Sequence, residues 1–177
     1  DLTDSKAIDV GLNYSPAGSP RMTFGGALTF DEIPADATVV HPDRGRDMTE
    51  WIATGNFSSG LGALFLRSEY AFILHEGRAT GKDYTHNAGF LQLELPREQW
   101  TPYARTGYRN MQEGDPFYAP LDRDLDEWRQ TIGVRNDFHT NVAIKFEASY
   151  GRRDERSGVD ISGDGIATVG IQIAWYF

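Results

Sequence analysis

Apolar and polar residues alternate with a period of two along most of this chain. In residues 141–152, Val142, Ile144 and Phe146 share one side of an extended segment, while Lys145 and Glu147 occupy the other. Successive side chains of a β-strand point to opposite faces, whereas an amphipathic helix repeats about every 3.6 residues. The pattern therefore predicts an all-β protein without an amphipathic helix. Nine strands are predicted, over residues 6–15, 20–31, 48–58, 61–75, 84–95, 99–111, 126–138, 141–152 and 165–177.

The segments between these strands are predicted to be alternately short and long. The short ones contain turn-forming residues such as Pro, Gly, Ser and Asn, and they span residues 15–20, 58–61, 96–99 and 138–141. The long ones are polar and span residues 32–47, 76–83, 112–125 and 152–164. Short turns at one end and long loops at the other are typical of an antiparallel up-and-down β-barrel that crosses a membrane. The strands are long enough for this, since about 9 to 11 tilted residues suffice.

The last predicted strand, residues 165–177, has the clearest pattern in the chain. Val169, Ile171, Ile173, Trp175 and Phe177 fall on one face, and the other face is small or polar. This strand resembles the closing strand of bacterial outer-membrane β-barrel proteins, whose terminal aromatic residue helps the assembly machinery to recognise them. Tryptophan and other aromatic residues prefer the boundary between membrane and water. We therefore expect five aromatics at that interface, namely Trp51, Trp100, Trp128, Trp175 and Phe177.

Composition restricts the possibilities further. The formal net charge of -9 disfavours nucleic-acid binding, which needs a basic surface, and the absence of Cys excludes disulfides and thiolate chemistry. Two acidic clusters fall in irregular stretches that are mostly predicted loop, and we expect both to be solvated loop surface. They comprise Asp31, Glu32, Asp36, Asp43 and Asp47, and Glu113, Asp115, Asp122, Asp124, Asp126 and Glu127.

The number of strands suggests that the barrel is incomplete. Single-chain bacterial barrels have an even number of strands with both ends in the periplasm, whereas nine strands are predicted here. We therefore interpret residues 1–177 as a single domain that forms the C-terminal part of a larger barrel and lacks N-terminal strands. The missing strands would come from the same polypeptide or from a partner chain. A closed barrel of eight strands is the alternative interpretation.

If the apolar face meets lipid, the opposite face lines the interior. Many charged side chains of both signs on that face are natural beside water, because wide barrels enclose an aqueous lumen. The cations of three successive strands give one wall a positive bias, which favours small anions. A ladder of Arg–carboxylate pairs without selectivity is the equal alternative. The predicted pore-lining residues are Arg21, Arg67, Glu69, Arg105, Arg109, Arg129, Arg135, Lys145 and Glu147.

Three segments resemble the last strands of porins, in particular of the phosphate-selective porin family. They are residues 100–109, residues 132–147 with the sequence GVRNDF followed by VAIKFE, and the terminal IAWYF of residues 173–177. The resemblance implies a barrel of 16 to 18 strands in the bacterial outer membrane, commonly a homotrimer, which conducts small solutes or ions passively. No lysine ladder typical of a strict phosphate channel is present, which leaves the solute open.

Other function classes receive less support from the residues. A hydrolytic barrel enzyme needs a nucleophile, a base and an orienting group within hydrogen-bond reach. His41, His75 and His86 lie in or beside predicted loops and His139 lies in a predicted turn, and none pairs with an inward Ser. We therefore expect no catalytic residue, no metal site and no cofactor. The remaining alternatives are a barrel that scaffolds a surface or electron-transfer complex and a soluble β-sandwich that binds a ligand.

Overall fold

The fold of the chain is described by a computed structural model. It describes residues 7–18, 21–33, 48–77, 81–112, 114–115, 117, 126–139, 141–153 and 165–175. Nine antiparallel strands in these residues form one sheet in sequence order. Their bounds are β1 Ile8–Tyr14, β2 Met22–Ile33, β3 Met48–Leu61, β4 Leu64–Gly77, β5 Lys82–Glu94, β6 Trp100–Met111, β7 Glu127–His139, β8 Val142–Arg153 and β9 Ile166–Trp175.

The all-β, up-and-down prediction is confirmed in the described part of the chain. Each strand pairs with the strand before it and the strand after it, and the described strands form one sheet rather than the two packed sheets of a sandwich. The described residues contain no helix long and apolar enough to cross a membrane.

The predicted alternation of short and long connections holds except at one hairpin. Strands β3 and β4 are joined by Gly62 and Ala63, and Gly62 has a φ of 64°, which Gly adopts without strain. A long loop was predicted between β4 and β5, over residues 76–83, and this is wrong. Residues 76 and 77 continue the pairing with residues 83 and 82, and Gly81 N–H donates to the Gly77 carbonyl at 2.7 Å. The connection is therefore only residues 78–81.

The strand register brings the predicted apolar sides of all nine strands onto one face. One row across the sheet pairs Ala104 with Ile132, Ile132 with Ala148 and Ala148 with Val169. The neighbouring row pairs Arg105 with Thr131, Thr131 with Ser149 and Ser149 with Thr168. Because a slip of one residue would exchange the two faces, this agreement shows that the register follows the hydrophobic pattern. We call the two sides the apolar face and the polar face.

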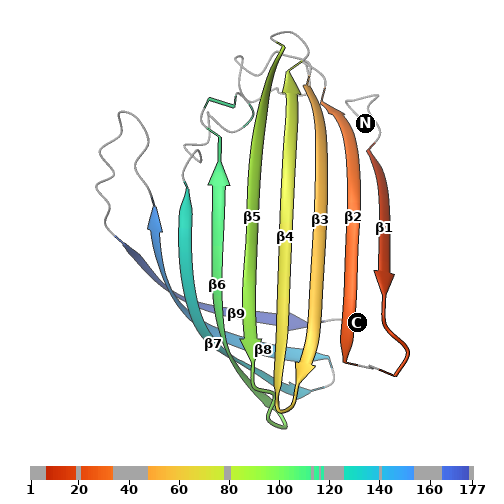
Figure 1. Cartoon of the computed structure of the whole chain (residues 1–177). Helices are drawn as coiled ribbons and strands as arrows, with labels where there is room; N and C mark the ends of the chain where they lie inside the picture. The colour runs from red at the N-terminus through yellow and green to blue at the C-terminus, as the bar shows by residue number, and fades with distance from the viewer. Residues whose placement is uncertain are drawn as a thin grey trace.

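The sheet bends into a deep trough, and β7, β8 and β9 turn across behind the earlier strands (Figure 1). Burial indicates that the polar face is the concave one. The buried hydrophobic side chains of the described residues, Met48, Tyr84, Tyr103, Met111 and Ala143, all belong to the polar face by strand parity. Most exposed large hydrophobic residues lie on the apolar face, and Val169 is the most exposed of them at 83%. The apolar face is therefore convex and uncovered.

Candidate functional site

Ion pairs cover the polar face of β6, β7 and β8. Glu147 accepts from Arg105 at 3.1 Å and pairs with Lys145 at 3.0 Å. Glu127 accepts from Arg109 at 3.2 Å and from Arg129 Nε at 2.8 Å. Each of these carboxylates therefore holds two cations, and the pairs run within and across strands.

The pairing leaves an excess of positive charge on this part of the polar face. Arg135 pairs with Asp137 on β7, so five cations meet three carboxylates, an excess of two. Half-exposed ion pairs contribute only about 0–1 kcal/mol each to stability. Their main effect is to hold the guanidinium and ammonium groups in fixed positions along the trough.

The other three predicted pore-lining residues belong to β4 or to a turn. Arg67 on β4 pairs with Glu94 on β5 at 2.8 Å. Glu69, two residues further along β4, lines an open depression of about 580 Å³ at the centre of the polar face. Arg109, Glu127 and Arg129 line the same depression. Arg21 lies outside the strands, just before β2, and donates to the Gly62 carbonyl at 3.2 Å, so the structure does not bring it together with the others.

Four of the five predicted interface aromatics are described, and all four lie near strand ends on the apolar face. Trp51 is near the start of β3, Trp100 is the first residue of β6, Trp128 is the second residue of β7, and Trp175 ends β9. Each of these tryptophans is exposed. Phe177, His41 and the acidic residues of the first cluster beyond Glu32 lie outside the described residues.

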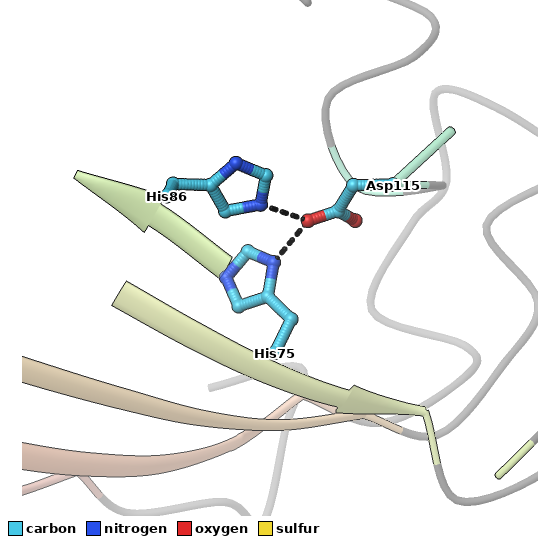
Figure 2. Close-up of side chains that lie close together, drawn as sticks. All are labelled: His75, His86 and Asp115. Carbon is cyan, nitrogen blue, oxygen red and sulfur yellow. Dashed lines mark hydrogen bonds and ion pairs between the residues drawn. The ribbon is translucent and has the colours of Figure 1, made fainter. Parts of the chain in front are cut away.

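A buried cluster of two histidines and two carboxylates lies where β4 and β5 approach their connecting hairpin. His75 of β4 and His86 of β5 are diagonal neighbours on the polar face, since Ile73 pairs with His86 and His75 pairs with Tyr84. Asp115, from the β6–β7 connection, points between the two rings (Figure 2). Its Oδ2 lies 2.6 Å from His75 Nδ1 and 2.5 Å from His86 Nε2. Glu50 of β3 completes the cluster, with Oε2 at 2.7 Å from His75 Nε2.

Neighbouring groups assign the protons of the two rings. Both ring nitrogens of His75 face carboxylate oxygens, which only accept hydrogen bonds, so this ring carries two protons and a positive charge. The Gln112 N–H donates to His86 Nδ1 at 3.1 Å, so a neutral His86 ring holds its proton on Nε2 and donates it to Asp115. Burial alone would raise the pKa of Asp115, but hydrogen bonds from His75 and His86 outweigh burial and lower that pKa below its usual range.

The expectation that Asp115 and Glu127 are solvated loop surface is wrong. Asp115 is 0% exposed because it closes over the two imidazoles, and its Oδ1 accepts from the Phe117 N–H at 2.8 Å. Glu127 is the first residue of β7 and is buried between two arginines. A run of acidic residues in a sequence usually indicates solvent-exposed side chains. Asp115 and Glu127 are buried because each has a cationic partner from another part of the fold, which the run itself does not reveal.

His75 and His86 lie at the loop-side ends of the predicted strands 61–75 and 84–95, beside a predicted loop, and no role was expected for them. The structure places both within strands, on the same face as the ion pairs. A short hairpin at residues 78–81 would have brought them together at the sequence level, because residues 75 and 86 then become diagonal partners. No sequence signal identified Asp115 as the third member, since a loop carries no pairing register.

No protein-family model, curated protein or solved structure matches this chain.

Proposed function

We propose that this chain forms part of the wall of a transmembrane β-barrel in a bacterial outer membrane, and that the barrel acts as a porin. The apolar face would meet lipid, and the polar face would line a water-filled passage for small solutes or ions. The observation that carries this proposal is the sorting of side chains by the register: a continuous, exposed, convex apolar face opposite a concave face of fixed ion pairs.

Energetics favour a lipid environment for the apolar face. Moving a fully exposed Val, Leu or Ile side chain out of water stabilises a protein by about 1.5–3 kcal/mol. Val10, Leu12, Ile132, Val169 and Ile171 are each at least 60% exposed, and residues on every strand add to the same face. Left in water, the face would forgo a free energy comparable to the whole stability of an ordinary domain, about 5–15 kcal/mol.

The two unpaired edges support the proposal that the barrel is larger than this sheet. Strands β1 and β9 are the edges of the described sheet, and both run in the same direction because an even number of reversals separates them. Antiparallel closure therefore needs an odd number of further strands. Seven or nine would give the 16 or 18 strands implied by the resemblance to phosphate-selective porins, supplied by the same polypeptide or a partner chain. A homotrimer is the assembly that this resemblance implies.

The excess of two positive charges on β6–β8 supports a weak preference for anions. Fixed cations along a narrow aqueous passage raise the local concentration of anions. The carboxylates that share these cations limit the effect, so we propose a bias rather than strict selectivity. The negative charge of Glu69, which lines the central depression, lowers the local concentration of anions.

Reconstitution tests the proposal. The native polypeptide should require detergent for extraction, insert into a planar bilayer and give stepwise conductance. Under a salt gradient, the reversal potential should indicate a modest preference for anions. A protein that is soluble and monodisperse without detergent would refute the membrane proposal. Membrane insertion without conductance would refute the porin and favour the scaffold alternative.

A further inference from the structure

The cluster at the loop end of β4 and β5 has the donor set of a transition-metal site. We infer that His75, His86 and Asp115 bind a divalent metal ion of the zinc class. Two imidazole nitrogens and one carboxylate oxygen from these residues lie within 4.8 Å of one another. Imidazole and carboxylate are common zinc ligands, and three protein ligands leave a fourth position for water.

Burial and charge distinguish this cluster from an ordinary surface group. His75 and Asp115 are 0% exposed and His86 is 1% exposed. With both rings neutral, Asp115 and Glu50 together carry two negative charges in a site with little access to water. Buried charges persist when they are paired or coordinate a metal. A divalent cation would balance the negative charges of the two carboxylates. The positive charge of the doubly protonated His75 ring balances one of those two charges.

The groups around the proposed ligands already have the arrangement of an outer shell. A histidine that binds a metal through one nitrogen usually donates its other N–H to a carboxylate or carbonyl. His75 donates from Nε2 to Glu50 at 2.7 Å, which leaves Nδ1 to face the metal position. The Phe117 N–H holds the second oxygen of Asp115, and the Phe117 ring packs edge-on against His75 with centroids 5.2 Å apart.

Binding requires small and specific changes. Two ligand atoms at about 2.0–2.1 Å from a tetrahedral zinc lie about 3.3 Å from each other, so the two nitrogen–oxygen distances to Asp115 must each open by about 0.7 Å. His75 gives up its Nδ1 proton. The His86 proton moves from Nε2 to Nδ1, and the Gln112 N–H, which now donates to Nδ1, turns to another acceptor. Metal binding thus releases one proton and shifts the end of β6.

The site with its outer shell would join four parts of the chain. Asp115 belongs to the β6–β7 connection, whereas His75 and His86 belong to neighbouring strands, and Glu50 comes from β3. A bound metal would therefore fix this connection against the polar face near one end of the trough. The inference needs only the folded sheet and is independent of whether the barrel conducts.

Direct metal binding tests the inference. The full chain, folded in detergent and stripped with a chelator, should bind one equivalent of Zn²⁺, and Co²⁺ should give the visible spectrum of a tetrahedral site. His86→Gln and Asp115→Asn should each lower affinity by more than about 100-fold, beyond the 10–100-fold typical of an outer-shell loss. Glu50→Gln should fall within that outer-shell range. His139→Gln removes an exposed histidine at the last residue of β7, away from the cluster, and should leave the affinity for zinc unchanged.

Three outcomes would overturn the inference: no stoichiometric binding to the unaltered chain, equal affinity in His86→Gln, or an equal loss in His139→Gln. Circular dichroism checks that each variant keeps its β-structure. If a ligand variant fails to fold, X-ray absorption of the unaltered chain loaded with zinc still decides the matter. A spectrum that fits two imidazole ligands and oxygen ligands supports the site, and a spectrum without imidazole scattering refutes it.

Discussion

Lysine substitutions at adjacent residues of β9 separate a lipid environment from an aqueous one. Val169 lies on the apolar face and is 83% exposed, whereas Thr168 lies on the polar face and is also exposed. The two residues share a strand and an edge, and both are β-branched, so the loss of strand propensity on changing either to Lys cancels in the comparison. What remains is the medium that each side chain enters.

The structure supplies the expected magnitudes. In water, a Lys at either exposed position should change the free energy of unfolding by no more than about 0.5 kcal/mol. In lipid, a Lys on the outer face of a barrel costs about 2–4 kcal/mol at the membrane midplane and less near the interfaces. Val169 is the fourth residue of ten in β9, away from the terminal Trp175, so a cost near 2 kcal/mol or more is expected for Val169→Lys. Thr168→Lys should cost almost nothing.

Equilibrium unfolding in denaturant measures the difference. The protein is folded into lipid vesicles, and tryptophan fluorescence follows the transition, because Trp51, Trp100, Trp128 and Trp175 are exposed on the apolar face. A free-energy difference between the two variants of less than about 0.5 kcal/mol would contradict the assignment of the apolar face to lipid. A larger cost for Thr168→Lys than for Val169→Lys would mean that the faces are reversed.

Three further predictions follow from the ion pairs and the histidine cluster. Replacing Arg105 and Arg109 by Gln should move the reversal potential toward cation preference, and an unchanged potential would show that these arginines do not face the conducting path. Glu127→Gln leaves Arg109 and Arg129 without their carboxylate and should lower the free energy of unfolding by about 1–3 kcal/mol, whereas a matched change at exposed Asp137 should cost less. The pKa of Asp115 is lower in the folded chain than in the unfolded chain, so its stabilising effect is present above the unfolded pKa of about 4 and is lost as the pH falls further. Unfolding midpoints are measured between about pH 6 and about pH 3, on either side of the unfolded pKa. They should fall more for the unaltered chain than for Asp115→Asn, and an equal fall of the midpoint in both proteins would contradict this.

Strand positions and faces could be predicted from the sequence because they depend on a local, repeated signal. The alternation in residues 141–152 and 165–175 is carried by every second residue, so a single exception does not obscure it. The same signal assigned Arg105, Arg129 and Lys145 to one face, and the pairing register brings that face together across β6, β7 and β8.

The partners of individual side chains could not be predicted in this way. The predicted strand over residues 126–138 already contains Glu127, but its two arginine partners depend on the register that places Arg109 of β6 opposite it and on the rotamer of Arg129. The short β4–β5 hairpin was missed because Glu76, Lys82 and Asp83 are polar, although they continue the pairing. Asp115 belongs to a connection without periodicity, and only the folded arrangement brings it to His75 and His86.

The sharing of one carboxylate between two cations has a consequence for how such a wall would change during evolution. Neutralising an arginine at Glu147 or Glu127 removes one charge, and the remaining cation keeps its carboxylate. Neutralising the glutamate instead frees two cations at once and raises the local potential. Under the proposed function, the loss of either glutamate would therefore strengthen the preference for anions and release two cations toward the solute, whereas the loss of one of their cations would weaken that preference.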